Sequence, residues 1–163
     1  GVMLDIEPYI SDSWKENPEE YMDRYISCMK KGYKFTQKNH LRTAICIPRH
    51  YDNQGLTSGL EELIKETCDE VAVMNYSCGN EIEAIRTEAA LSEKYGKELH
   101  CILEFQEVGK HGLTENKTYR NKGIDNAKET WEKLQKEYKN INVTRDYHWS
   151  RPVREMLEEK NAD

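Results

Sequence analysis

Acidic, amide and aromatic side chains recur at the ends of short apolar runs in this chain. The first run, 2–7, ends in Asp5 and Glu7, and Tyr9 follows it. In parallel β/α sheets the carboxyl ends of the strands face the ligand crevice, so side chains placed there converge on one rim. Such a rim suits a sugar, because hydroxyls need polar partners and the C–H faces of the ring stack on aromatic groups. The later runs add Arg49, Asn75, Tyr76, Glu104, Gln106, His148 and Trp149.

Asp5 and Glu7 form the most informative pair. Side chains alternate along a strand, so these two carboxylates share a face with Met3, one pleat apart. Two neighbouring carboxylates repel when both are ionised, and one of them then keeps a proton near neutral pH, as a general acid must. The structural alternative is an ion pair with Arg49 or another basic residue, in which the two acids have no catalytic role.

A regular alternation of strands and helices is needed to position these residues. The hydrophobic patterns predict strands at 2–7, 42–48, 70–76, 99–106 and 142–149, and helices at 18–39, 57–68, 80–95, 118–138 and 151–160. This repetition indicates an α/β fold with a parallel sheet, either an open doubly wound sheet or part of an eightfold barrel. Because no glycine-rich phosphate loop is present, the barrel is favoured.

Composition excludes several classes of protein. With 33% charged and 37% hydrophobic residues, the chain is typical of globular proteins with solvated helices, and no apolar run approaches the roughly 20 residues of a membrane span. The net charge of −6 disfavours nucleic acid as a partner. The five cysteines lack the paired spacing of a zinc site and are expected to be buried free thiols. No cofactor is predicted, and the localisation is left open between cytoplasm and cell envelope.

The opening residues resemble the catalytic strand of the chitinase-like family 18 glycoside hydrolases, whose pattern is D-G-x-D-x-D-x-E. Gly1, Asp5 and Glu7 match that pattern, and Met3 stands where the family has its middle aspartate. The run 74–76 resembles the family's M-x-Y-D motif, with Ser77 in place of the aspartate, and Trp149 falls where an eighth-strand tryptophan forms the floor of the sugar site.

The resemblance implies a (β/α)8 TIM barrel, represented here by its C-terminal five βα units, with residues 1–163 as a single unit. It implies that Glu7 protonates the glycosidic oxygen, and that Asp5 orients the substrate's acetamido group, which Tyr76 hydrogen-bonds; no protein nucleophile is then required. The expected partners are a carbohydrate substrate and either the missing N-terminal half of the barrel or a second copy, because an isolated partial barrel exposes two sheet edges.

Three alternatives are left open by the residues. In the first, Glu104 acts as nucleophile or base opposite Glu7, as in retaining barrel glycosidases. In the second, the chain is a non-catalytic carbohydrate-binding barrel that keeps Trp149, Tyr76 and Tyr9. In the third, a metal-dependent hydrolase, Asp5, Glu7, Glu104 and His148 meet at one site, although no metal-binding signature supports it.

Overall fold

A computed structural model describes residues 1–162 of the chain, with side chains described through residue 159. Five strands form one parallel sheet in the order β1-β2-β3-β4-β5. They are β1 (Val2–Asp5), β2 (Thr43–Pro48), β3 (Glu70–Met74), β4 (Glu98–Glu104) and β5 (Val143–His148). The order never reverses within the described residues, so this is not the doubly wound alternative.

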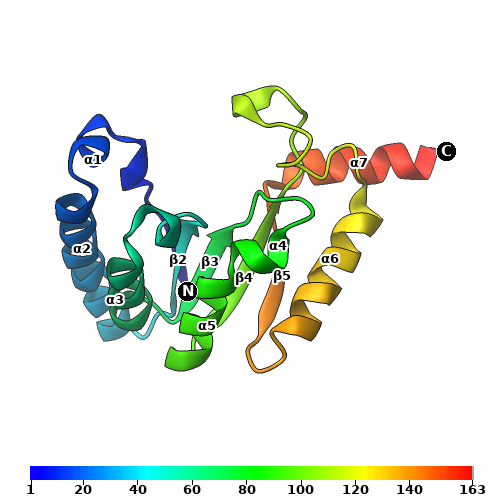
Figure 1. The fold of residues 1–163 in the computed structure, drawn as a ribbon. Helices are drawn as coiled ribbons and strands as arrows, with labels where there is room; N and C mark the ends of the chain where they lie inside the picture. The colour runs from blue at the N-terminus through cyan, green and yellow to red at the C-terminus, as the bar shows by residue number, and fades with distance from the viewer. Residues whose placement is uncertain (163) are drawn as a thin grey trace.

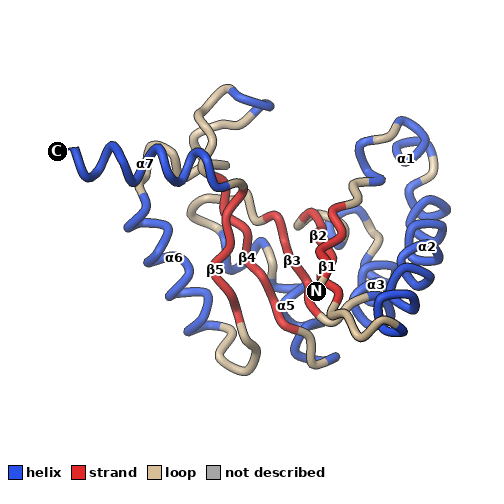
Figure 2. Tube along the Cα trace, turned by 180° about the vertical axis from the view of Figure 1, so that it is seen from behind, coloured by secondary structure: helices blue, strands red, loops and turns tan. Residues whose placement is uncertain are grey.

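The helices connect successive strands. They are α1 (Asp12–Glu16), α2 (Pro18–Lys38), α3 (Thr57–Thr67), α4 (Glu81–Ala84), α5 (Arg86–Tyr95), α6 (Ile124–Glu137) and α7 (Ser150–Ala162), with short 3-10 turns η1 (Pro8–Ile10), η2 (Asp52–Gln54) and η3 (Lys110–Gly112). Figures 1 and 2 show α2, α3, α5 and α6 on one side of the sheet, whereas no helix lies over the strands on the other side. We call that uncovered side the open face. None of the described helices is both long enough and apolar enough to cross a membrane.

The main hydrophobic core lies between the sheet and its helices. Ile45, Val71, Val73, Leu99 and Leu103 point from alternate positions of the central strands into this layer and are fully buried. Their neighbours in sequence therefore point to the open face. There Cys46, Ala72 and Ile102 form a small second apolar cluster, with Met74 and Tyr76 packed against it.

Two of the predicted helices differ from those observed. The predicted helix 80–95 is interrupted at Ile85, because the Glu81 carbonyl accepts a hydrogen bond from Asn75 (2.9 Å) and the Ile82 carbonyl accepts one from Tyr138 (2.6 Å). The predicted helix 118–138 begins only at Ile124. In the preceding segment the Thr118 hydroxyl lies 2.7 Å from the Gln106 carbonyl, to which it donates, so these residues form a fixed connection to the end of β4 instead of a helical turn.

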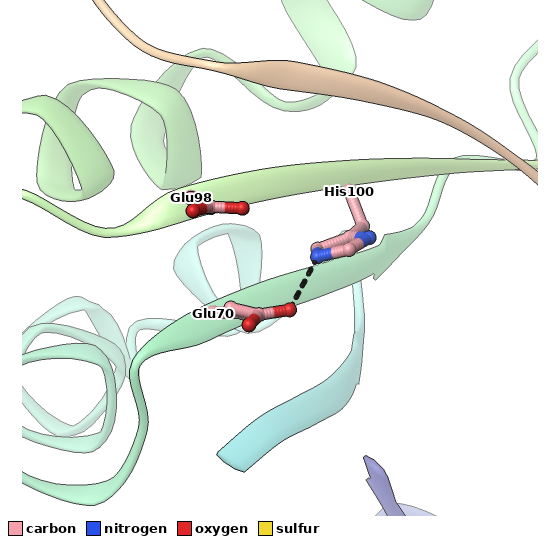
Figure 3. A group of neighbouring side chains, drawn as sticks. All are labelled: Glu70, Glu98 and His100. Atoms are coloured by element: carbon pink, nitrogen blue, oxygen red, sulfur yellow. Dashed lines mark hydrogen bonds and ion pairs between the residues drawn. The ribbon is translucent and has the colours of Figure 1, made fainter. Parts of the chain in front are cut away.

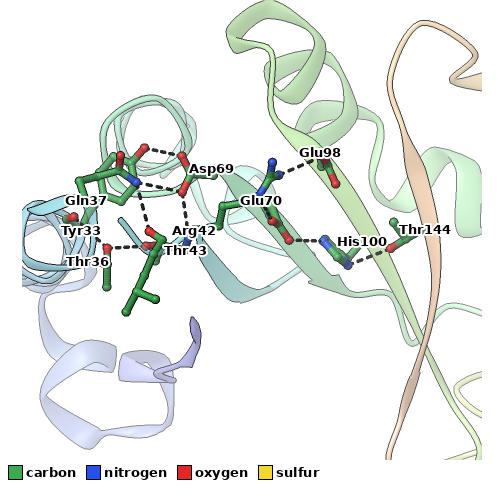
Figure 4. A network of polar contacts seen from close by, with 11 residues as sticks. Tyr33, Thr36, Gln37, Arg42, Thr43, Asp69, Glu70, Glu98, His100 and Thr144 are labelled. Atoms are coloured by element: carbon green, nitrogen blue, oxygen red, sulfur yellow. Dashed lines mark hydrogen bonds and ion pairs between the residues drawn. The ribbon is translucent and has the colours of Figure 1, made fainter. Parts of the chain in front are cut away.

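Polar contacts hold the amino ends of the strands (Figure 4). The Asp69 carboxylate accepts hydrogen bonds from the Tyr33 hydroxyl (2.8 Å), the Gln37 amide (3.1 Å) and the Thr43 backbone amide (2.8 Å). These bonds tie α2 and β2 to the start of β3. They lie at the edge of the sheet opposite to the predicted chemistry, so their role is structural.

Candidate functional site

A cleft of about 670 Å³ lies on the open face at the carboxyl ends of the strands, and we call it the rim cleft. Its apolar wall includes Cys46, Met74 and Ile102. Most of the residues predicted from the sequence to form the site line it, namely Asp5, Glu7, Tyr76, Glu104, Gln106, His148 and Trp149. Strands far apart in the sequence thus bring together the side chains that we expected to converge.

Glu104, at the end of β4, is the most tightly held of these acids and is only 2% exposed. One carboxylate oxygen accepts the backbone amides of Phe105 and Gln106, both at 2.8 Å. The other accepts the Gln106 side-chain amide (3.1 Å) and His148 Nδ1 (2.8 Å). Burial alone raises the pKa of a carboxyl, but the hydrogen bonds from His148 and Gln106 outweigh it and hold the pKa of Glu104 below its usual value. Glu104 is therefore a buried, ionised carboxylate.

His148, at the end of β5, is fixed by that carboxylate. Its hydrogen bond to Glu104, reinforced by the negative charges of Glu104, Asp5 and Glu7, raises the pKa of the imidazole above 6.5, against the opposing effect of burial. The ring stands next to the Tyr76 ring, with centroids 6.1 Å apart. With Nδ1 bonded to Glu104, Nε2 is the nitrogen left for a ligand.

Asp5 and Glu7 both line the rim cleft, as their alternation along the first strand predicted. Asp5 is paired in register with Cys46, and burial together with the Asp5 carboxylate raises the pKa of the Cys46 thiol to about 12. One oxygen of Glu7 accepts a hydrogen bond from the Tyr9 hydroxyl. No ion pair joins either acid to Arg49 among the described residues, so the predicted structural alternative has no support in these contacts.

Tyr76 follows β3, which lies between the strand of Asp5 and the strand of Glu104 in the sheet, and its side chain is half-buried. Burial raises the pKa of its hydroxyl, and the carboxylates of Glu104, Asp5 and Glu7 act in the same direction. The hydroxyl therefore keeps its proton over the physiological pH range and can donate it in a hydrogen bond to a ligand.

A smaller cavity of about 220 Å³ adjoins the rim cleft, and we call it the side cavity. Tyr9 and Arg49, two further residues predicted to bind substrate, line this cavity rather than the cleft. Glu7 and Tyr76 line both spaces and so stand at their boundary.

Asn75 is the one predicted site residue that the structure places elsewhere. It is 1% exposed and lies on the helix-covered side of the sheet, where its amide donates to the Glu81 carbonyl at 2.9 Å. The reason is the alternation along β3, which sends Tyr76 to the open face and its neighbour Asn75 to the opposite side.

Some residues of the cleft were not predicted. The connection between β4 and α6 contributes His111, Leu113 and Lys117, and Figure 1 shows this segment rising above the sheet. The signal in the sequence is the pair Gly109 and Gly112, which both have positive φ (92° and 73°) and so allow the tight turns of an ordered loop.

Another cavity, of about 710 Å³, lies beside α4 and α6. Its buried polar groups already bind one another, because the Tyr119 hydroxyl contacts both Glu81 and Thr130. None of the predicted site residues lines it. The convergence of acids and aromatic rings therefore identifies the rim cleft, and not this cavity of similar size, as the candidate site.

One group of side chains on the open face has the spacing of a metal site. Ligand atoms of Glu70, Glu98 and His100 lie within 4.8 Å of one another (Figure 3), and no other such group occurs among the side chains described. However, Arg42 donates to Glu70 (2.6 Å) and to Glu98 (2.9 Å), and His100 lies between Glu70 and Asp146 at 2.9 and 3.1 Å. These acids are already paired, and they lie near the amino ends of the strands, away from the rim cleft (Figure 4).

No protein-family model, curated protein or solved structure matches this chain.

Proposed function

We propose that this chain is part of a (β/α)8 glycoside hydrolase-like domain, resembling the chitinase-like family 18 enzymes, and that the rim cleft cleaves a glycosidic bond in a polysaccharide or glycan. The unreversed strand order and the placement of the long helices on one side support the barrel, because each βα unit of a barrel adds its strand beside the previous one.

The observation that carries the proposal is the meeting of three carboxylates with aromatic side chains in one cleft. Asp5 ends β1, Glu7 follows it by two residues and Glu104 ends β4, three strands away in the sheet; all three line the same space as Tyr76 and Trp149. Trp149 is 49% exposed, so its ring is available to stack on a sugar. His148 pairs with Glu104 and Lys117 lines the same cleft, but no ion pair joins a cation to Asp5 or Glu7 among the described residues.

Glu7 acts as the general acid. Because the Tyr9 hydroxyl occupies one carboxyl oxygen, the other oxygen is the one that presents a proton to the glycosidic oxygen. The exposed Asp5 carboxylate stabilises the positive charge that develops at the sugar ring as the bond breaks, or the substrate's acetamido group if it has one. Tyr76 donates a hydrogen bond to the same unit.

Glu104 acts through His148 in this proposal. Both of its oxygens already accept two hydrogen bonds and the side chain is buried, so it holds the imidazole in place instead of attacking the substrate. His148 then offers Nε2 to a sugar hydroxyl or to the water that completes hydrolysis. Glu104 is thus a positioning residue, and its use as nucleophile is the less favoured of the two roles.

The open face requires a partner in this proposal. Strands β1 and β5 each lack a neighbour on one side within the described residues, and Met3 on the open face is 51% exposed. We propose that further βα units or a second copy of the chain cover these edges.

Hydrolysis of a panel of chromogenic glycosides and polysaccharides tests the function. We expect Glu7→Gln to lower turnover of the polysaccharides, whose sugar-alcohol leaving groups need a proton, roughly 10²- to 10⁴-fold, the usual contribution of a general acid. The matched control is Glu16→Gln, an exposed acid of α1 outside both cavities, which should leave turnover unchanged. Equal turnover in both variants would refute the role of Glu7. Glycan binding without turnover would identify a carbohydrate-binding protein instead.

A further inference from the structure

The side cavity differs from the rim cleft in its charge. Arg49, just after β2, lines the side cavity but not the rim cleft, whereas Lys117, in the connection between β4 and α6, lines both. Among the described residues Glu7 is the only acid that lines the side cavity, whereas Asp5, Glu7 and Glu104 all line the rim cleft. Neither cation forms an ion pair or a side-chain hydrogen bond with any described residue. Both positive charges are therefore available to an anion in the side cavity.

The remaining wall of the side cavity is neutral and supplies hydrogen bonds. Burial, with a further contribution from the Arg49 charge, lowers the pKa of His50, so its imidazole is uncharged at neutral pH. The His50 ring packs edge-on against the Tyr9 ring, with centroids 5.2 Å apart, and this contact fixes its orientation. The Tyr9 hydroxyl donates to one oxygen of Glu7, so it is already used and does not donate to a ligand in the side cavity.

We propose that the side cavity binds an anionic substituent, a carboxylate or a sulfate, on the sugar unit next to the one held in the rim cleft. This inference rests on the proposed function, because Glu7 and Tyr76 line both spaces and place the scissile bond between them. Arg49 offers a planar fork of donors that matches a carboxylate or sulfate, and Lys117 adds a second positive charge. The substrate class is therefore an acidic glycan.

A simple anion tests the cavity without any sugar. We expect sodium sulfate, titrated at constant ionic strength and followed by NMR chemical shifts, to bind the protein in a saturable way. Arg49→Gln and Lys117→Gln should each weaken that binding about tenfold. Lys38→Gln, which removes an exposed lysine at the end of α2, is the control and should leave it unchanged. Equal binding by all four proteins would overturn the assignment. Unchanged thermal unfolding of the variants shows that they are folded.

A matched pair of sugars tests the substrate class. Oligogalacturonides and their fully methyl-esterified forms share one backbone and differ only in charge. Sulfated and unsulfated forms of one oligosaccharide provide the second arm, which distinguishes a carboxylate from a sulfate. We expect tighter binding of the charged member in at least one pair, and loss of that preference in Arg49→Gln. No preference in either pair would overturn the acidic-glycan class. Saturable sulfate binding by a protein that binds no sugar would leave the anion site standing and reject the glycan function.

Discussion

At the scale of single residues, the site depends on how neighbouring groups set one another's protonation. Glu104 is ionised because four donors surround it, and His148 gains a proton more readily because Glu104 faces it. The residue types at these positions were predictable, since each one ends a strand. The sequence does not show that Glu104 is buried and positions His148, while His148 is exposed and can contact a ligand. Burial depends on packing with residues distant in sequence.

Replacement of Glu104 by Gln tests this coupling. The variant keeps the shape of the side chain but removes the negative charge that raises the pKa of His148. We expect the pKa of His148 to fall toward 6.5 or below, measured by NMR titration of the ring protons. The pair stabilises the fold fully between about pH 4.5 and pH 6.5, the ordinary pKa values of the two groups. This contribution is lost as the pH rises through the raised folded-state pKa of His148, and as it falls through the lowered folded-state pKa of Glu104. An unchanged His148 titration would show that the two groups are not coupled.

Glu88 in α5 gives a second pH-dependent prediction. It is fully buried, neither carboxyl oxygen has a hydrogen-bond partner, and burial raises its pKa to about 7. The folded protein therefore binds a proton more tightly than the unfolded chain, so stability is greatest below the unfolded pKa near 4.5 and falls as the pH rises through 7.

We expect the contribution of Glu88 to the free energy of unfolding to fall by ~3 kcal/mol between pH 5 and pH 8. Glu88→Gln should remove most of this slope, whatever its effect on absolute stability. Urea unfolding at several pH values measures the slope. Parallel pH profiles for the two proteins would contradict this account of Glu88.

At the scale of elements, the strands were the best predicted part of the fold. All five begin within one residue of the expected position. For β2, β3 and β4 the reason is that a buried parallel strand leaves a mostly apolar run, whereas β1 and β5 are partly exposed edge strands. The helices were less predictable at their ends. Residues 118–123 continue the amphipathic pattern of α6, yet side-chain and backbone bonds to the end of β4 hold them out of the helix. Such tertiary competition leaves no local signal in the sequence.

Asp69 provides the prediction at this scale. It joins α2, β2 and β3 through three hydrogen bonds, one of them from the Thr43 backbone amide. Asp69→Ala should lower the free energy of unfolding by about 2–3 kcal/mol, because the buried Thr43 amide and the half-buried Tyr33 hydroxyl lose their acceptor. Urea unfolding measures the change. Asp23→Ala, at an exposed position of α2, is the control and should change stability by less than about 0.5 kcal/mol. Similar effects of the two substitutions would show that the Asp69 contacts contribute little.

At the scale of the whole molecule, the main features are the open face and the two sheet edges, β1 and β5, which have no neighbouring strand on one side within the described residues. The βα repetition predicted the parallel sheet and the rim at the ends of its strands, but it left the strand order open between a barrel and a doubly wound sheet. The side cavity was not predictable, because Lys117 reaches it from a long connection that has no regular period. Most of the site can thus be found from the ends of strands, and the rest only from the path of the loops.

The uncovered edges predict self-association. Strand β1 is an edge strand, and Met3 on it exposes half of its side chain on the open face. An inward-pointing charge on an edge strand opposes pairing with another sheet. We expect Met3→Lys to raise the dissociation constant of the self-associated form about tenfold, which corresponds to ~1.4 kcal/mol. Sedimentation velocity over a range of concentrations measures it. A monomer at all concentrations in both proteins would contradict the prediction.

The central claim is that Glu7 protonates the leaving group of a glycosidic bond. Its most direct test is to measure how the loss of rate in Glu7→Gln depends on that leaving group. A good leaving group, such as 2,4-dinitrophenolate, departs without protonation, whereas a sugar alcohol does not. We predict that Glu7→Gln cleaves dinitrophenyl glycosides at nearly the wild-type rate but loses roughly 10²- to 10⁴-fold on the natural linkage. Equal losses on both substrates would contradict the role of Glu7 as the acid.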